Sequence, residues 1–232
     1  HSGLFKLDGG AMFGVVPKVL WSKKYPCDEN NLCSWAMRCL LVEDDDRLVL
    51  IDNGIGDKQD EKFLKNYHLH GDDSLEKSLA KNGFKPDDIT DVILTHLHFD
   101  HCGGSIKYAD DGESYALAFP NATYWISKKQ YEWGTHPNQR EKASFLKENI
   151  LPIEESGQLK LIEKEGEILP NIDIKFYDGH TEAQAIPHIN YNGKTIVFMA
   201  DLMPSTVHIP MPWIMAFDVR PLQTLKDKER FY

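Results

Sequence analysis

Four side chains that can bind a metal ion lie within residues 95–101, in the run THLHFDH. His96 and His98 alternate, so in an extended segment both side chains point the same way. Asp100 and His101 follow where two glycines let the chain turn, which can aim them at a second point a few Å away. Imidazole suits zinc, iron and similar metals, and a carboxylate can bind one metal ion or bridge two. The run therefore predicts a metal site.

Two further ligand types come at the ends of later apolar runs. His180 stands in DGHT, after the run IDIKFY, and Asp201 follows TIVFMA. A strand that ends in Asp places the carboxylate at the rim of a sheet, although a turn or helix-capping role would also suit Asp201. Asp52 ends the run LVLID. Two interpretations fit it equally well: support of the ligands or of a neighbouring loop, or a plain Asp-Asn-Gly turn.

The other histidines are expected to be structural. Histidines 68 and 70 also form an HxH pair, but no strand precedes them and no Asp-His follows, so they predict a loop or the rim of a pocket. His188 lies within a strand-like run and predicts sheet packing. His136 predicts a surface loop, and Cys102 predicts a small buried residue that packs the turn.

The elements that must position these residues are short strands with helices between them. The predicted strands cover residues 36–42, 48–52, 91–95, 122–126, 172–177, 185–190 and 195–200. An acidic turn at 43–46 makes the first two a hairpin, and Asn192-Gly193 makes the last two another. Residues 73–82 and 138–149 predict helices. This order favours sheets covered by helices over an all-β sandwich.

Composition limits the kind of protein. The chain has 232 residues, of which 41% are hydrophobic and 27% charged, and it shows no repeat or linker, which predicts a single domain over 1–232. The net charge of −10 argues against a nucleic-acid partner. No apolar run reaches the ~18 residues of a membrane span, and no signal peptide is visible. Four irregularly spaced cysteines predict reduced thiols in a cytoplasmic protein.

The runs HLHFDH, DGHTEAQ and MAD together resemble the metallo-β-lactamase superfamily of hydrolases. The N-terminal run LDGGAMFGVVPKVLWSK and the GH…ADLMP pair are similar to the branch of quorum-quenching N-acyl-homoserine-lactone lactonases. The resemblance implies an α/β fold, a four-layer αββα sandwich of two mixed β-sheets with helices outside. It implies that His98 favours hydrolysis, because the oxygen-reducing di-iron relatives carry Glu at that position.

The resemblance also implies roles for the ligands and two divalent metal ions, zinc first, with iron or manganese as alternatives. Metal 1 would be bound by His96, His98 and His180. Metal 2 would be bound by Asp100 and His101, and Asp201 would bridge the two ions. A metal-bridged hydroxide would open the substrate, and Asp100 would be the catalytic proton relay.

The expected substrate is a small lactone or ester, most of all an N-acyl-homoserine lactone, with no nucleic acid or membrane as partner and a homodimer left open. The alternatives are a phosphoesterase or organophosphate hydrolase, a thioesterase on the same dinuclear site, and a non-enzymatic binding protein that kept the fold. Aromatic and apolar residues could line an acyl pocket, but core packing fits each of them better; they are Met12, Phe13, Trp21, Trp35 and residues 211–215.

The C-terminal region predicts one missing ligand. The family resemblance calls for a seventh ligand, a His well after Asp201, and only His208 follows, seven residues on. That is too close, so His208 is expected in a pocket wall or in packing. Residues 221–232 predict an amphipathic helix that stops without a cap. We therefore expect a truncated or disordered C-terminus, a natural chain that continues past Tyr232 with the missing His, and partial occupancy of metal 2.

Overall fold

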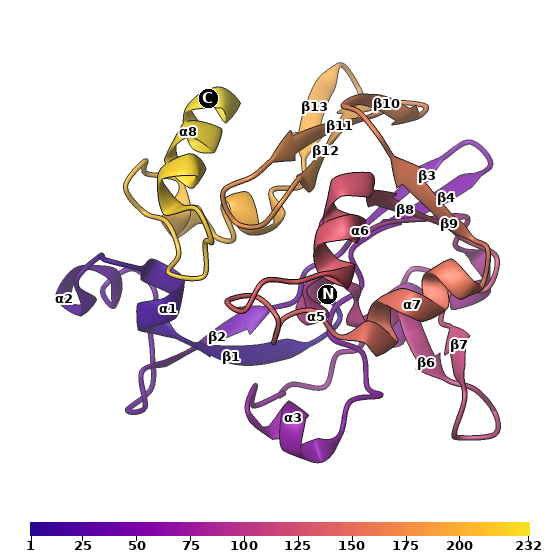
Figure 1. Ribbon diagram of the computed structural model, residues 1–232, viewed down its shortest axis with the longest axis horizontal. Helices are drawn as coiled ribbons and strands as arrows, with labels where there is room; N and C mark the ends of the chain where they lie inside the picture. Colours follow the sequence, from indigo (N-terminus) through magenta and orange to yellow (C-terminus); the bar gives the residue numbers. More distant parts are fainter. The chain divides into compact units, whose positions relative to one another are not determined.

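The run of ligands follows a strand of a five-stranded sheet (Figure 1). The computed structural model describes residues 1–232 and divides into two units by the contacts within each. Unit 1 comprises His1–Phe5 and Ala36–Glu163, and unit 2 comprises Lys6–Trp35 and Lys164–Tyr232. The chain passes between them within β1 (Leu4–Asp8) and β2 (Leu32–Ala36), which pair with each other.

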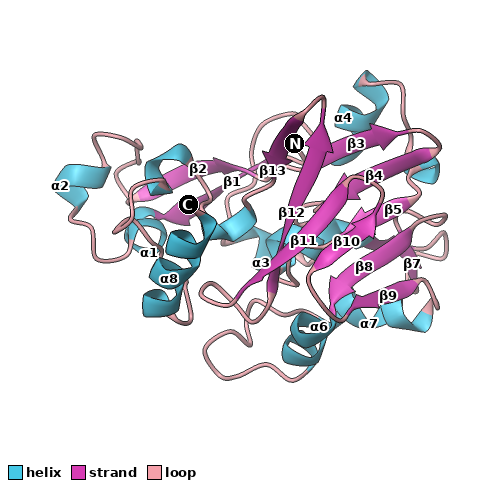
Figure 2. Cartoon of the chain, turned by 90° about the horizontal axis from the view of Figure 1, so that it is seen from above, coloured by secondary structure: helices cyan, strands magenta, loops and turns pink.

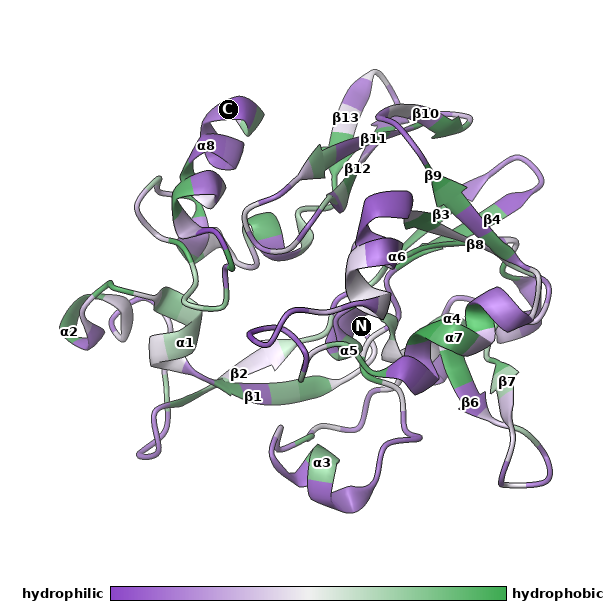
Figure 3. Cartoon of the chain, viewed as in Figure 1, coloured by the Kyte–Doolittle hydropathy of each residue, from purple (hydrophilic) through white to green (hydrophobic).

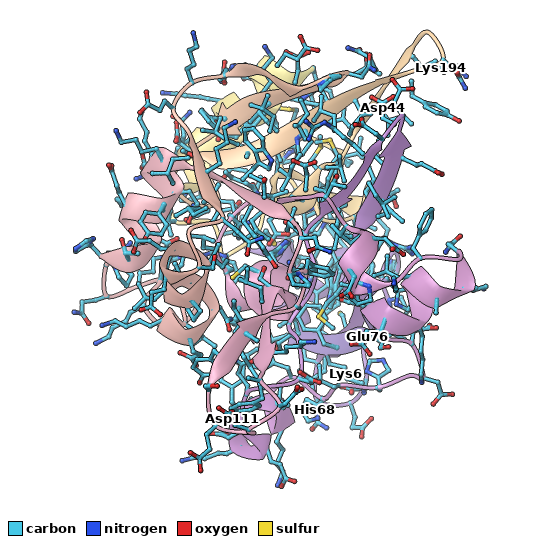
Figure 4. All side chains as sticks on the ribbon, turned by 90° about the vertical axis from the view of Figure 1, so that its right-hand side faces the viewer. Lys6, Asp44, His68, Glu76, Asp111 and Lys194 are labelled. Atoms are coloured by element: carbon cyan, nitrogen blue, oxygen red, sulfur yellow. The ribbon has the colours of Figure 1, made fainter.

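The sheet of unit 1 is mixed, in the order β3-β4-β5-β8-β9. β3 and β4 form an antiparallel hairpin, and the remaining neighbours run parallel. Asp44 lies at the turn that joins the two strands of this hairpin, where Asp45 takes a positive φ of 50° (Figure 4). The hairpin and the strands predicted from residue 91 and residue 122 are confirmed. The bounds are β3 Leu40–Asp44, β4 Arg47–Ile51, β5 Asp91–Ile93, β8 Thr123–Ser127 and β9 Leu159–Ile162.

Helices and one small hairpin complete unit 1. The predicted helix at 73–82 is confirmed as α4 (Leu75–Lys81), where the Ser74 hydroxyl accepts from the Lys77 amide and so satisfies one unpaired N–H of the first turn. The other elements are α3 Glu61–Lys65, η1 Pro86–Asp88, α5 Phe99–Cys102, η2 Gly103–Ser105, β6 Ile106–Tyr108, β7 Tyr115–Leu117, α6 Lys128–Thr135 and α7 Lys147–Glu155.

One face of this sheet and the helices of unit 1 form its main core. Alternate strand residues, among them Leu50, Val92 and Tyr124, pack with Leu79 of α4 and Ile153 of α7. Period-two alternation along a strand puts these side chains on one face. Burying each aliphatic side chain contributes about 1.5–3 kcal/mol. α7 presents apolar residues on one side and charged residues on the other (Figure 3).

The predicted helix at 138–149 is wrong over most of its length, because α7 begins only at Lys147. The Asn138 carboxamide oxygen accepts from the amides of Arg140 and Glu141, which holds a turn in place of a helix. Asn138 also donates through Nδ2 to the Glu141 carboxylate, at 2.6 Å. The side chain of Glu141 is thereby directed into the interior.

The sheet of unit 2 is antiparallel throughout, in the order β10-β11-β12-β13, so of the two sheets only that of unit 1 is mixed (Figure 2). The predicted Asn192-Gly193 hairpin joins β12 to β13, with φ of 49° and 72°. β13 ends at Val197, three residues earlier than predicted, because the chain enters a 3-10 turn at Ala200. The strands are β10 Gly166–Leu169, β11 Ile172–Tyr177, β12 Gln184–Tyr191 and β13 Lys194–Val197.

The amphipathic C-terminal helix predicted at 221–232 is confirmed as α8 (Pro221–Phe231), with Pro at its first position. Phe231 of α8 packs against a small core that includes Tyr177, Ile186 and Leu202. The remaining helical elements of unit 2 are α1 Gly9–Phe13, α2 Lys18–Trp21, η3 Ala200–Leu202 and η4 Thr206–His208. None of the helices combines the length and the apolar character that a membrane span requires.

Candidate metal centre

The histidines of the ligand run gather just beyond β5. The ring centroid of His96 lies 4.5 Å from that of His98 and 4.0 Å from that of His101. Asp100 Oδ2 lies 3.6 Å from His101 Nε2. His96 is fully buried and His98 nearly so, whereas Asp100 and His101 are half-buried. Unit 1 thus places all four predicted ligands of the run together, with the alternation of His96 and His98 that the sequence predicts.

Asp52 holds the outer side of this cluster. Its Oδ2 lies 2.8 Å from His101 Nδ1 and accepts from the Thr95 hydroxyl at 2.8 Å, while Oδ1 accepts from the Thr95 amide. The Thr95 hydroxyl in turn lies 3.1 Å from His96 Nδ1. Burial raises the pKa of Asp52, and the neighbouring His101 opposes that rise. Asp52 therefore contacts the candidate ligand His101 directly and the candidate ligand His96 through Thr95, whereas the sequence left such a role open against a plain turn.

The loop after β4 also clamps the backbone behind the ligands. The Asn53 amide donates to the His101 carbonyl at 2.9 Å, and the Gly104 amide donates to the Gly54 carbonyl at 2.9 Å. A Cβ on Gly103 would lie 2.2 Å from the Ile55 carbonyl oxygen. Only glycine permits this approach of two backbones, so the two glycines after the ligand run fix the position of the turn as well as its shape.

His98 is held by a carboxylate that the sequence did not reveal. Its Nε2 lies 3.4 Å from Glu141 Oε1, and Glu141 is 4% exposed. The other oxygen of Glu141 accepts from Trp133 Nε1 at 2.7 Å and from Asn138 at 2.6 Å. A carboxylate with this many donors is fixed in place, and it orients the His98 ring.

In unit 2, His180 and Asp201 lie together. His180 Nε2 is 3.3 Å from Asp201 Oδ2, and His180 Nδ1 is 3.1 Å from Asp218 Oδ1. Asp218 is 1% exposed, and its second oxygen accepts from the Met215 amide. His180 therefore has the same arrangement as His98 and His101, with a buried carboxylate at one ring nitrogen.

The loop that carries His180 is fastened to α8. Asp227 Oδ2 accepts from the amides of Asp178 and Gly179, at 2.9 and 2.7 Å. Gln223 donates to the other oxygen of Asp227 at 2.8 Å. A Cβ on Gly179 would lie 2.4 Å from Thr224 Cα, so loop and helix pack backbone against backbone. Burial raises the pKa of Asp227, and its hydrogen bond from Gln223 opposes that rise.

Backbone strain accompanies these residues. Asp52, Ala183 and Ala200 all have positive φ, at 55°, 47° and 40°. An alanine in this region is uncommon and is kept only where the surroundings impose it. Each of the three lies next to or within a few residues of a predicted ligand or of its support.

The other histidines and the cysteine have structural surroundings. His208 is 1% exposed, with Nε2 2.8 Å from the Met12 carbonyl oxygen, Nδ1 2.8 Å from the Ser205 hydroxyl and its ring stacked on Phe13. The predicted packing role of His208 is confirmed. Cys102 is fully buried and directs its thiol to the Leu97 carbonyl, as predicted. His68 is exposed on a loop (Figure 4).

The aromatic residues suggested for an acyl pocket pack with one another in unit 2. Phe13 lies against Trp21, Trp35 and Trp213, with centroid distances of 5.0, 6.0 and 6.1 Å. A different aromatic group lies beside the ligand run. Phe99 contacts Tyr67 at 4.7 Å and Phe63 at 5.2 Å, and burial together with the Asp100 carboxylate raises the pKa of Tyr67.

Comparison with known proteins agrees with this geometry. The family profile of the metallo-β-lactamase superfamily matches residues 38–230, and the chain belongs to this family. Its sequence is 27% identical over 161 residues to an N-acyl homoserine lactonase of Bacillus cereus, covering 65% of this chain and 57% of the relative. It is 30% identical over 151 residues to a probable metallo-hydrolase of Mycobacterium tuberculosis, covering 58% and 45%. This chain thus spans little more than half the length of the lactonases that it matches.

Solved structures show the same mixed α/β fold. A probable metal-dependent hydrolase from Staphylococcus aureus superimposes with a TM-score of 0.91 at 35% identity, over 99% of this chain and 80% of that one. AidC, a dizinc quorum-quenching lactonase solved with N-hexanoyl-L-homoserine, superimposes with a TM-score of 0.74 at 24% identity, over 99% and 80%. At that identity the second likeness concerns the fold alone.

Proposed function

We propose that this protein is a metal-dependent hydrolase that opens lactones, and that six residues bind two divalent metal ions. The ligands would be His96, His98, Asp100 and His101 of unit 1 with His180 and Asp201 of unit 2. One observation carries the proposal. One ring nitrogen of each of the four histidines has an oxygen partner outside the proposed ligand set, so the opposite nitrogen of each ring is the one we propose for a metal. At His101 and His180 that nitrogen faces the proposed ligands Asp100 and Asp201.

The partners fit metal binding better than a plain polar core. Three of them are buried carboxylates, Asp52, Glu141 and Asp218, and a carboxylate at the outer nitrogen raises the basicity of an imidazole ligand. They predict coordination through Nε2 of His101, Nδ1 of His98 and Nε2 of His180.

When bound, two divalent ions of this kind supply Lewis-acid polarisation of a carbonyl and a water acidic enough to react at neutral pH. The mixture of imidazole and carboxylate favours zinc, with iron and manganese as alternatives. The protein's own contribution is to position the ions and to move a proton. Asp100 is half-buried beside His101 and can hold or pass the proton that the departing alkoxide takes up.

The substrate proposed is a lactone with an apolar substituent, of the N-acyl-homoserine type. The rings of Phe63, Tyr67 and Phe99 offer an apolar surface directly beside Asp100. The lactonase relatives favour this class over other carboxylic esters. We propose a cytoplasmic location on the four cysteines, all of which are free thiols here.

A substrate panel tests the proposal. Zinc-loaded protein is assayed on N-hexanoyl-homoserine lactone, an open-chain ester, a thioester and a phosphotriester, with Asp218→Ala as the matched variant that loses the partner of His180. We expect the lactone to have the highest kcat/KM and Asp218→Ala to lower it at fixed metal concentration. If the phosphotriester or the thioester had a higher kcat/KM than the lactone, the proposed substrate class would be wrong. No turnover of any member by metal-loaded protein would contradict the enzyme proposal.

A further inference from the structure

Two of the four cysteines flank a tight turn in unit 2. The Asn31 amide donates to the Asp28 carbonyl at 3.1 Å, and the Asp28 amide donates to the Leu32 carbonyl at 2.9 Å. Asn31 takes a positive φ of 67°. This is a three-residue hairpin loop, a turn closed by a residue in the left-handed region. Asp28 and Leu32 therefore close the hairpin, with the Asp28 amide on the Leu32 carbonyl and the Leu32 amide on the Asp28 carboxylate at 3.0 Å.

Extending this register by one residue puts Cys27 opposite Cys33. In an antiparallel ladder the pair next to a hydrogen-bonded pair is not hydrogen-bonded, and its Cα atoms lie about 4.5 Å apart with the side chains close together. A disulfide needs Cα atoms about 4.4–6.8 Å apart. The pair is thus at the type of position that a cross-strand disulfide fits.

Two residues farther out, the same register is visible in the side chains. Tyr25 and Trp35 are opposite each other by this count, and their rings stack 4.2 Å apart at an interplanar angle of 11°. The Tyr25 hydroxyl also donates to the Ser34 carbonyl at 2.8 Å. Side chains two residues apart on a strand share a face, so the two cysteines lie on the face that carries this stacked pair.

The thiols differ in how readily each can react. Cys33 is fully buried, and burial together with the neighbouring Cys27 thiol raises its pKa to about 11. Cys27 is half-buried and is the accessible member. Since the thiolate is the attacking species, Cys27 is the sulfur that a disulfide oxidant meets first.

We propose that Cys27 and Cys33 are a redox-active pair, a modification site at which a small-molecule disulfide such as oxidised glutathione closes a cross-strand disulfide. Cys27 attacks one sulfur of the oxidant and releases one thiol. Cys33 then attacks Cys27 of the mixed disulfide and releases the second thiol. Two protein thiols are oxidised, one disulfide is reduced to two thiols, and both protons pass to the leaving thiolates. The bond would tie residues 25–28 to β2 without change to the aromatic pair.

The chain offers a sharp test, because trypsin cleaves after Lys24 and Arg38 and so leaves both cysteines in one peptide, residues 25–38. Folded full-length protein is equilibrated in glutathione redox buffers, its free thiols are blocked, and the digest is analysed by mass spectrometry. We expect this peptide to lose the mass of two hydrogen atoms. Cys39→Ser should behave like the wild type, and Cys27→Ser should give no such loss.

A comparison with the unfolded chain decides whether the native geometry favours the bond. The same equilibration in concentrated guanidinium gives the intrinsic tendency of so short a loop to close. If the disulfide fits the native hairpin, its equilibrium constant in the folded protein should exceed the unfolded value several-fold, and oxidation should raise the melting temperature. A folded protein whose 25–38 peptide stays reduced, carries glutathione without closing, or closes less readily than the unfolded chain would overturn the proposal.

Discussion

At the scale of single residues, the most informative group is Glu141, because it acts on a ligand from outside the ligand run. Glu141→Gln keeps the size of the side chain but removes the charge that faces His98 Nε2. Loss of such an outer partner costs about 10–100-fold in metal affinity. Competition with a chromophoric chelator measures this, and Glu132→Gln on the exposed side of α6 is the control. Equal zinc affinity in the two variants would show that Glu141 serves only the packing of Trp133.

Asp100 belongs to the same scale and is expected to act in the chemical step. Asp100→Asn retains the shape and one oxygen, but it can no longer accept a proton near His101. We expect kcat for lactone hydrolysis to fall by about 100-fold or more, with a much smaller change in KM. The measurement is steady-state kinetics at saturating zinc. An unchanged kcat with a raised KM would assign Asp100 to substrate binding.

At the scale of elements, the turn after the ligand run depends on a close approach of two backbones. Gly103 has φ of −59°, which alanine adopts without strain, so the effect of Gly103→Ala is purely steric. With the Ile55 carbonyl in the way, we expect a loss of at least ~2 kcal/mol in the free energy of unfolding and weaker zinc binding. Gly112→Ala is the control, since nothing lies near the position of its Cβ. The only expected loss there is the ~1 kcal/mol that it costs to place alanine at a φ of 70°. Denaturant titration compares them, and equal losses would contradict the account of this turn.

In unit 2, the C-terminal helix α8 supports the loop that carries the candidate ligand His180. Asp227→Ala removes the acceptor of two amides in the loop that carries His180, so His180 should become less well positioned. We expect zinc affinity to fall by about 10-fold, and a partial recovery in Asp227→Asn, which keeps one oxygen. Calorimetric zinc titration measures it, with exposed Glu229→Gln as control. If Asp227→Ala lowers the melting temperature of the zinc-free protein but leaves zinc affinity intact, α8 supports folding only.

The sequence predicted the elements that have strong local signals. The short apolar runs LVLID and DVILT, the Asn-Gly turn and the Ser74 cap all predicted correct strands, hairpins and a helix, because each depends on neighbouring residues. Short strands such as β6 and β10 and the helices α1 to α3 went unpredicted, since their few residues are held by tertiary contacts.

The candidate site shows the same division. The candidate ligands could be proposed from the sequence because they stand close together at the ends of predicted strands. Glu141 and Asp218 could not, because each is one acidic residue among 36 in the chain and lies 43 and 38 residues from the histidine that it contacts. The turn at Asn138 directs Glu141 inward. Because residues 138–149 were predicted as a helix, no sequence pattern indicated that Glu141 would contact His98.

At the scale of the whole molecule, the central proposal is that the protein is a lactone hydrolase that needs about two metal ions per chain, and its membership of the metallo-β-lactamase superfamily supports this proposal. Each ligand histidine has its support within its own unit, through Asp52 and Glu141 in unit 1 and Asp218 in unit 2. Partial occupancy of metal 2 remains a prediction.

The most direct test titrates metal-free protein with zinc while lactone hydrolysis is recorded. The account predicts no turnover of N-hexanoyl-homoserine lactone by the metal-free chain, a rise as zinc is added, and a plateau near two equivalents, or near one if metal 2 binds weakly. His96→Ala should show no rise at any zinc concentration. Equal turnover with and without zinc, or full activity in His96→Ala, would contradict the central claim.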